Sequence, residues 1–202
     1  MKSIKYKHEK IEPSKVVCIG RNYVEHIEEL GNEIPASMVV FNKANSAIAN
    51  ELYYFSEQCR FEGEICFLIQ DHKIEGVGFG LDLTHADIQN HLKCKGLPWE
   101  RAKSFDNSAL FSEFVPICDD LTTLEMKLYI NDELIQFATY DLMMYKPDIM
   151  LREIESFMTL ENGDIIMSGT PKGVGTYAVG DRFLGQVFSG NKLLVEGCWV
   201  VK

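Results

Sequence analysis

The stretch Arg60–Ile69, RFEGEICFLI, places two carboxylates at the start of an apolar segment. Strand side chains alternate between faces with a rise of about 3.3 Å per residue, so Glu62 and Glu64 point the same way, with Cα atoms roughly 7 Å apart. The run 65–69 is apolar on both faces, which predicts a strand buried inside a sheet. Like charges beside such a strand are costly unless something neutralises them.

Around this strand the sequence predicts further strands and few helices. Apolar runs predict strands at 15–20, 38–43, 77–83 and 164–169, and two hairpins, one around Asn131–Glu133 and one around Ser189–Asn191. Because no regular βαβ alternation connects these segments, we expect an α+β architecture, a mixed β-roll with few short helices, rather than a doubly wound sheet.

Three segments have helical character: residues 21–30, the segment after Thr84, and the segment after Pro147. Thr84 is a candidate N-cap, and Gly96 is a candidate C-cap for the helix that Thr84 would begin. The spacing after Pro147 predicts a buried face containing Ile149, Ile154, Phe157 and Met158.

Length and composition limit the class of protein. A chain of 202 residues with 46% apolar content is expected to form one domain, residues 1–202, with a lead-in at 1–14. The 30 acidic residues outnumber the 20 Lys and Arg, the net charge is −10, and basic runs are short, so neither nucleic acid nor an anionic membrane is an expected partner.

No apolar stretch reaches the length of a membrane span. Six scattered cysteines without a C-x-x-C pair suggest buried thiols in a reducing, cytoplasmic setting.

The carboxylates suggest a cation site. Asp82, at the end of the predicted strand 77–83, joins Glu62 and Glu64 in a partial shell of oxygen ligands that suits a hard divalent cation. The alternative is an exposed strand start with ordinary salt bridges, because E-x-E is a common pattern. The spacing alone leaves both interpretations open.

Other polar residues are candidates for proton transfer or binding. His26 and Glu29 share a helix face, and a carboxylate that accepts the Nδ1 proton of histidine makes the other ring nitrogen a better base; the alternative is a surface histidine among charges. Lys103 lies between apolar residues and is either a charge stabiliser or a solvated side chain. GTPKGVG (169–175) lacks the Walker pattern, but the Thr170 hydroxyl can bind a small carboxylate.

The order of the motifs is more specific than any one of them. GRNYVEH with Glu29, FEGE, LDLT, GLPWERAKSFD, ENGDIIMSGTPKGVG and a final hairpin follow one another from about residue 15 to the C-terminus. This series resembles the fumarylacetoacetate hydrolase family, and within it the short acylpyruvase and oxaloacetate decarboxylase branch. The resemblance implies the family's mixed β-sandwich roll and a homodimer.

The resemblance also implies roles for individual residues. The metal ligands would be Glu62, Glu64 and Asp82, holding Mg²⁺, with Mn²⁺ as a substitute. His26 and Glu29 would activate water from a mobile lid at about 22–37, and Lys103 would be the active-site lysine. Substrate-facing positions would be Arg21, Asn22, Gln89 and Thr170.

The implied reaction is hydrolysis of the C–C bond of an acylpyruvate, a 2,4-dioxo acid such as fumarylpyruvate or acetylpyruvate, through a metal-held pyruvate enolate. The alternatives are decarboxylation of oxaloacetate, keto–enol isomerisation of a 2-oxo acid at the same site, or a catalytically idle homologue that binds a ligand. One departure bears on the substrate: the family pattern DxTARDxQ reads DLTHADIQ here, so Ala86 replaces an arginine and His85 is a candidate replacement cation.

Overall fold

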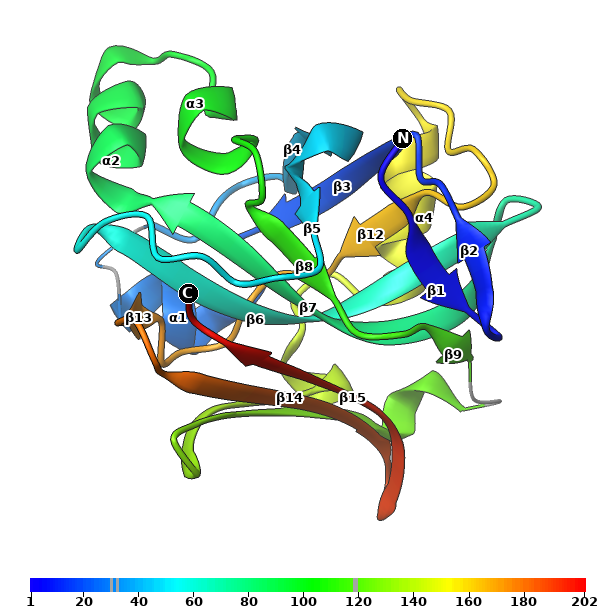
Figure 1. The fold of residues 1–202 in the computed structure, drawn as a ribbon. Coiled ribbons are helices and arrows are strands. Elements are labelled where there is room, and N and C mark those ends of the chain that lie inside the picture. Colours follow the sequence, from blue (N-terminus) through cyan, green and yellow to red (C-terminus); the bar gives the residue numbers. More distant parts are fainter. Residues whose placement is uncertain (30, 32, 118–119) are drawn as a thin grey trace.

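The structure is a computed structural model that describes residues 1–29, 31, 33–117 and 120–202, and two curved sheets dominate it (Figure 1). The larger sheet has the strand order β4-β3-β12-β6-β7-β8-β5, with β13 and β9 paired to β6 and β7. The smaller sheet has the order β11-β10-β14-β15. The predicted α+β architecture with short helices is confirmed.

The elements follow the predicted segments closely. The strands of the larger sheet are β3 (Lys15–Gly20), β4 (Val39–Ala44), β5 (Ile48–Ala49), β6 (Cys59–Gln70), β7 (Lys73–His85), β8 (Ala109–Phe111), β9 (Val115–Pro116), β12 (Ile165–Met167) and β13 (Gly175–Thr176). The smaller sheet contains β10 (Leu124–Ile130), β11 (Glu133–Thr139), β14 (Arg182–Ser189) and β15 (Lys192–Val200), and a separate hairpin contains β1 (Ile4–Tyr6) and β2 (Glu9–Ile11). The helices are α1 (Val24–Glu29), α2 (Ala86–Lys95), α3 (Glu100–Lys103) and α4 (Pro147–Glu155), with short 3-10 turns η1 (Asn45–Ala47), η2 (Leu121–Thr123) and η3 (Tyr140–Leu142).

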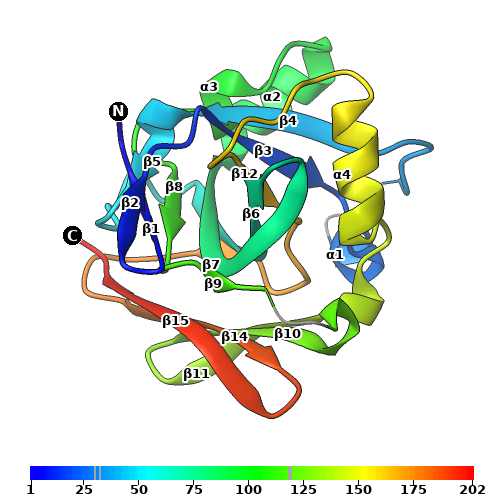
Figure 2. The same ribbon diagram turned by 90° about the vertical axis from the view of Figure 1, so that its right-hand side faces the viewer.

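The opening stretch lies in β6, which forms a long antiparallel hairpin with β7 (Figure 2). Asp71 and His72 make the turn with φ values of 47° and 58°, and the pairing places Glu62 opposite Asp82. Strands on both sides of the hairpin pair with it, β12 with β6 and β8 with β7. The register of the hairpin is therefore fixed from its flanks as well as from its turn.

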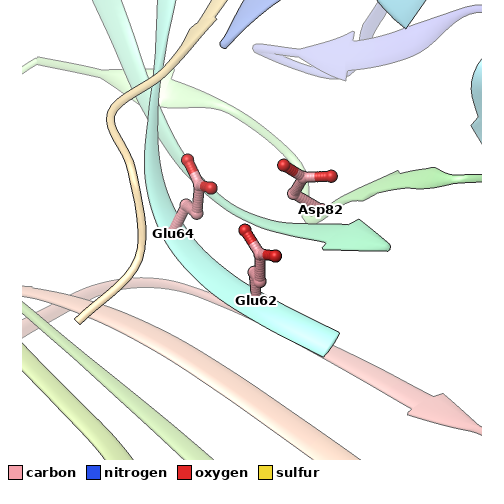
Figure 3. Close-up of side chains that lie close together, drawn as sticks. All are labelled: Glu62, Glu64 and Asp82. Carbon is pink, nitrogen blue, oxygen red and sulfur yellow. The ribbon is translucent and has the colours of Figure 1, made fainter. Parts of the chain in front are cut away.

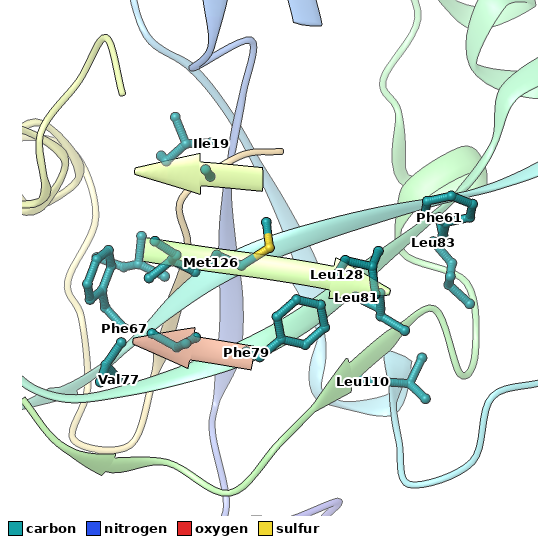
Figure 4. Packing of buried hydrophobic residues seen from close by; sticks show 14 of the residues in the cluster. Ile19, Phe61, Phe67, Val77, Phe79, Leu81, Leu83, Leu110, Met126 and Leu128 are labelled. Carbon is teal, nitrogen blue, oxygen red and sulfur yellow. The ribbon is translucent and has the colours of Figure 1, made fainter. Parts of the chain in front are cut away.

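Both faces of β6 are buried, as its apolar run predicts. One face carries Phe61 and Phe67, which pack with Phe79 of β7 against Met126 and Leu128 of β10 between the two sheets (Figure 4). The opposite face carries Cys66 and Leu68, which pack with residues of β3 and β12 in a second cluster. Glu62 and Glu64 share this second face because they alternate with Phe61 and Gly63.

Two helix predictions need correction. Thr84 is not the N-cap of α2: it is the penultimate residue of β7, and its Oγ1 donates to Glu62 Oε1 at 2.7 Å, while His85 takes the cap position. Gly96 does end α2, with φ 63°. In α4 the buried face carries Met150 and Ile154, whereas Ile149 is exposed, because the register of the helix turns a different set of side chains to the core; Phe157 lies beyond the end of the helix at Glu155 and is exposed.

Some of the cysteines are buried and others are exposed, and the same holds for the residues of the predicted lid. Cys18, Cys59 and Cys66 are buried thiols as predicted, but Cys94 and Cys198 are exposed, and Cys118 lies outside the described residues. In the segment 22–37, Tyr23 and Ile27 are buried and Ile34 is exposed, while residues 30 and 32 are outside the described part.

Within the described residues, no helix is long and apolar enough to cross a membrane.

Candidate active site

Three carboxylates converge at one end of the β6–β7 hairpin (Figure 3). Glu62 and Glu64 come from one face of β6, and Asp82 comes from the residue paired with Glu62 on β7. One oxygen from each lies within 4.8 Å of the others. Asp82 and Glu64 are buried, at 0% and 2% exposure, so the alternative of a solvated strand start does not hold.

Two buried lysines contact this cluster. Lys103 Nζ, from the end of α3, lies 2.9 Å from Glu62 Oε2 and 2.8 Å from Asp82 Oδ2. Lys43 Nζ, from β4, lies 2.8 Å from Asp82 Oδ1 and donates to the backbone carbonyl of Lys103. Lys103 is therefore not a solvated side chain.

The charges of the cluster perturb one another. Burial by itself would lower the pKa of Lys103, but the charges of Asp82 and Glu62 raise it above its ordinary value. Burial would raise the pKa of Glu62, yet Lys103 and hydrogen bonds outweigh burial and lower it. Burial, together with the charges of Asp82 and Glu62, raises the pKa of Glu64 well above its ordinary range. The group as a whole contains more carboxylate than its lysines can match.

This excess fits a divalent cation. With all three carboxylates ionised, the two ammonium groups leave one negative charge in a buried space, which is unfavourable unless Glu64 binds a proton or the cluster binds a further cation. The donors are oxygens alone, as Mg²⁺ and Mn²⁺ prefer. Gly169 N–H donates to Glu64 Oε2 at 2.6 Å and holds that side chain in the cluster.

His26 and Glu29 form the pair that the sequence predicts. His26 Nδ1 lies 3.3 Å from Glu29 Oε2, and the imidazole is buried, at 6% exposure. Glu29 is fixed from the other side by the N–H of Gly173, at 3.0 Å from Oε1. The Gly-rich segment 169–175 thus supports both Glu64 and the His26–Glu29 pair through backbone donors.

One cavity collects most of the predicted site. It is lined by all three carboxylates and by His26, Lys103, Arg21, Gln89 and Thr170. Thr170 Oγ1 donates to the carbonyl of Gly63 at 3.0 Å and accepts from Gln136 Nε2 at 2.9 Å. Gln136 Oε1 also accepts from Gly63 N–H, so a side chain of the smaller sheet fixes the strand that carries the carboxylates.

Asn22 does not belong to the cavity lining. Its side chain is fully buried, with Nδ2 donating to the carbonyls of Ser168 and Tyr145 and Oδ1 accepting from Tyr145 N–H. These bonds use all of its hydrogen-bonding groups except one acceptor lone pair, so in this structure Asn22 joins the backbone at Tyr145 and Ser168 and does not face the cavity.

His85 is also not the replacement cation. Its ring stacks on Phe105 with centroids 4.1 Å apart and meets Phe55 edge-on, and burial lowers its pKa. The sequence did not indicate Lys43 or Lys93, although Lys93 lines the cavity. Gln89 and Lys93 are four residues apart on α2, a spacing that puts Lys93 on the face of the predicted Gln89.

Comparison with known proteins identifies the family. Residues 15–196 match the model of the fumarylacetoacetate (FAA) hydrolase C-terminal domain. The chain belongs to the fumarylacetoacetate hydrolase family. The resemblance carried by the ordered motifs is thereby confirmed.

Related family members include enzymes of two kinds. This family member is 36% identical to oxaloacetate tautomerase YcgM of Escherichia coli over 199 residues, 89% of this chain and 90% of the relative. It is 34% identical to the human mitochondrial oxaloacetate tautomerase FAHD1, covering 83% and 84% of the two chains. The structure of fumarylpyruvate hydrolase from Pseudomonas aeruginosa with Mn²⁺ and pyruvate superimposes with a TM-score of 0.88 at 25% identity, covering 99% and 95%.

These relatives confirm the prediction of an enzyme. They include both kinds of enzyme named from the resemblance, a hydrolase that acts on an acylpyruvate and tautomerases that act on a 2-oxo acid. The tautomerases match at higher identity than the fumarylpyruvate hydrolase, so isomerisation, given as an alternative to hydrolysis, is the better supported reaction.

Proposed function

We propose that this protein is a divalent-cation-dependent oxaloacetate tautomerase that interconverts the enol and keto forms of the acid. The observation that carries the proposal is the cavity in which His26, hydrogen-bonded to Glu29 from outside the cavity lining, meets Lys103 and the three carboxylates. The sequence identity to oxaloacetate tautomerases supports the same reaction.

Tautomerisation moves one proton between oxygen and carbon. The enol loses the proton of its C2 hydroxyl, C3 gains a proton, and no bond between heavy atoms breaks. Glu29 accepts the hydrogen bond of Nδ1 and keeps the imidazole of His26 in the tautomer whose other nitrogen can accept and return a proton. Lys103, held at the cavity wall by two carboxylates, stabilises negative charge that develops on the substrate oxygens.

Glu62, Glu64 and Asp82 are the residues that would hold the cation, for which we propose Mg²⁺, with Mn²⁺ as a substitute. When bound, such a cation polarises the carbonyl of a 2-oxo acid and makes the adjacent carbon more acidic. Arg21, Gln89 and Thr170 line the same cavity and are proposed to orient the small acid.

Hydrolysis of an acylpyruvate is the second candidate, because a histidine oriented by a carboxylate also activates water. The three reactions differ in their products: hydrolysis of an acylpyruvate releases pyruvate and a second carboxylic acid, decarboxylation of oxaloacetate releases pyruvate and CO₂, and tautomerisation releases neither pyruvate nor CO₂.

One assay compares these reactions. Purified protein with Mg²⁺ is expected to accelerate loss of the enol absorbance of freshly dissolved oxaloacetate, without release of pyruvate or CO₂. Acetylpyruvate and fumarylpyruvate tested in parallel would reveal hydrolysis by pyruvate release. Acceleration of none of these reactions would contradict the proposal and favour an idle, ligand-binding homologue.

Glu64→Gln tests the cation. This change removes one anionic ligand at constant shape, so we expect loss of Mn²⁺ binding in a calorimetric titration and a fall in tautomerase activity of at least about 100-fold. Glu161→Gln, at an exposed position outside the cavity, is the matched control. Full activity of Glu64→Gln in the presence of a chelator would contradict a role for the cation.

The oligomeric state of the protein is a separate proposal. We propose a homodimer, as the family resemblance implies, and light scattering coupled to size exclusion is expected to give twice the 23.0 kDa chain mass.

A further inference from the structure

A second cavity lies beside the candidate active site. It has a volume of about 310 Å³, against about 40 Å³ for the inner cavity that holds the carboxylates and His26. The two cavities share Glu62, Gln89 and Lys93, and the outer one is also lined by Arg60, Thr84 and Ala86. A ligand that enters the inner cavity with one end therefore has its other end beside the outer cavity.

The positions of the lining residues follow from regular geometry. Arg60 lies two residues before Glu62 on β6, so its side chain leaves the strand on the face of the carboxylates, opposite Thr84 in the pairing with β7. Ala86, Gln89 and Lys93 are spaced i, i+3 and i+7 along α2, which places them on one face of that helix. This helix face forms the wall across from Arg60.

The position of the missing family arginine lies on this same wall. Ala86 is the first residue of α2, and an arginine there would project from the helix into the outer cavity. The methyl group of Ala86 leaves this volume open and supplies no charge. Lys93 lies two helical turns further along the same face, and its ammonium group supplies a positive charge to the cavity in place of the arginine.

Arg60 and Lys93 are half-buried cations on the wall of the outer cavity. Among the described residues, neither makes a salt bridge, whereas the buried Lys43 and Lys103 are both matched by carboxylates. The Lys93 ammonium lies 5.2 Å from the ring centroid of Trp99. Burial is the largest cause that lowers the pKa of Lys93, to about 8; the neighbouring charges of Arg21, Lys103 and Arg60 lower it further, and Glu62 opposes them.

Glu29 is an acid that lines the outer cavity, but its oxygens are already used. They accept from Gly173 N–H at 3.0 and 3.2 Å and face His26 Nδ1 at 3.3 Å. Glu62 is likewise paired with Lys103 and Thr84. The positive charge of Arg60 and Lys93 is thus available to an anionic ligand.

We propose that Arg60 and Lys93 form a subsite for the second carboxylate of a dicarboxylic 2-oxo acid, in place of the arginine that the family pattern has at Ala86. This inference rests on the proposed function, because it assumes that the 2-oxo acid end occupies the inner cavity. Arg60 offers a planar pair of donors to a carboxylate and Lys93 a point charge, and both bonds are charge-assisted.

The two cavities together can receive the two ends of such an acid. The inner cavity is lined by the three carboxylates and Lys103, and the outer cavity adds Arg60. The second carboxylate of a four-carbon acid is then directed toward the shared wall at Gln89 and Lys93. The subsite therefore selects dicarboxylic over monocarboxylic acids.

The test compares Lys93→Met and Arg60→Met with wild type on two ligands that share the 2-oxo acid end. Oxaloacetate has the second carboxylate and pyruvate lacks it. Each variant is expected to raise the KM for oxaloacetate about tenfold, while kcat and the inhibition constant of pyruvate stay within about twofold. Lys95→Met, at an exposed position on the same helix outside the cavity, is the matched control.

Two further variants separate charge from packing. Lys93→Arg keeps the cation and is expected to keep the KM of wild type. Ala86→Arg in the Lys93→Met background returns the family's charge to the cavity and is expected to lower the KM again. An unchanged KM in both methionine variants, or equal weakening of oxaloacetate and pyruvate, would overturn the subsite.

A binding measurement separates this inference from the proposed reaction. Oxaloacetate and pyruvate are each titrated calorimetrically into Mg²⁺-loaded wild type and Lys93→Met. If wild type shows no tautomerase activity but Lys93→Met selectively loses oxaloacetate binding, the reaction is wrong and the subsite stands. If wild type is an active tautomerase and the variant binds both ligands as wild type does, the subsite is wrong and the reaction stands.

Discussion

Two buried lysines, Lys43 and Lys103, balance the negative charge of the carboxylates in the site. Lys43 is the more enclosed of the two. Its ammonium is 0% exposed, contacts Asp82 Oδ1 at 2.8 Å, and donates to Ser108 Oγ at 3.1 Å and to the Leu83 carbonyl at 3.3 Å. It also donates to the carbonyl at the end of α3, on the residue Lys103 itself. Lys43 therefore positions both Asp82 and the helix that delivers Lys103.

Lys43→Met is expected to destabilise the protein by about 3 kcal/mol in the presence of a chelator, because Asp82 loses one of its two buried partners. Added Mn²⁺ should recover part of this loss, since a dication supplies the missing charge. Urea unfolding with and without Mn²⁺ measures both effects. Lys10→Met at an exposed position is the control, and equal stability of the two variants would contradict the assigned role of Lys43.

The carboxylates of the site could be predicted from the sequence. Of its two lysines, only Lys103 was predicted. Alternation along β6 and the end of the next strand are local properties, and they indicated Glu62, Glu64 and Asp82 as a candidate cation site, which the ordered family motifs then favoured over ordinary salt bridges. Lys43 was missed because a lysine at the end of an apolar strand normally reaches solvent. Gln136 was missed because its contact with Gly63 depends on how two sheets are stacked, which no local pattern determines.

At the scale of elements, the N-terminal segment and β12 are joined through one buried carboxylate. Asp164 accepts from the N–H groups of Ser14, Lys15 and Glu161, from Ser14 Oγ at 2.7 Å, and from Lys15 Nζ at 2.5 Å. Its side chain is 0% exposed. Because β3 begins at Lys15 and β12 at Ile165, this carboxylate fixes where the two parallel strands start.

Asp164→Asn gives a prediction about pH. Burial would raise the pKa of Asp164, but the bonds from Lys15, Ser14 and the backbone lower it below its ordinary value. A carboxyl whose pKa is lower in the folded than in the unfolded state stabilises the fold above the unfolded pKa of about 3.9, and this stabilisation is lost as the pH falls through the folded value.

The variant is therefore expected to be less stable than wild type by about 2 kcal/mol at pH 7, with the difference shrinking below pH of about 4. Unfolding by urea across this pH range measures the difference. Asp148→Asn, which removes an exposed i,i+4 pair with Arg152, should show little change at any pH. A difference that stays constant down to low pH would contradict the assigned ionic role.

Strands and hairpins were predicted better than helix details. The segments of β3 and β6 contain apolar runs, and the strands of the hairpins β10–β11 and β14–β15 alternate apolar and polar residues around turn residues, so local sequence suffices for them. The start of α2 was misplaced because the Thr84 hydroxyl bonds a carboxylate of the neighbouring strand instead of the helix backbone. That competition is a tertiary effect.

At the scale of the whole molecule, the smaller sheet packs on the hairpin that carries the site. Gly185 of β14 faces the ring of Phe79 of β7, and a Cβ at this glycine would overlap the ring carbons. Phe79 is fully buried and also contacts Trp199 of β15, with ring centroids 6.0 Å apart. The two sheets can approach this closely because Gly185 has no side chain.

Gly185→Ala is expected to destabilise the protein by about 1–3 kcal/mol, because Phe79 must move within a close-packed layer. Gly20→Ala is the control, since a Cβ there meets its nearest neighbour at 3.4 Å, an ordinary contact. Thermal and urea unfolding of both variants measure the difference. The sequence pattern could not predict this contact, since it depends on the relative placement of strands about 100 residues apart in the chain.

The turn of the β6–β7 hairpin, at Asp71 and His72, lies at the opposite end from the carboxylates. A chain divided at this turn would leave Glu62 and Glu64 on one fragment and Asp82 and Lys103 on the other. Neither fragment alone would contain a complete cation site, and each of the two strands keeps a flanking partner in the assembled sheet. The protein thus has the layout of a fragment-complementation pair in which cation binding reports reassembly.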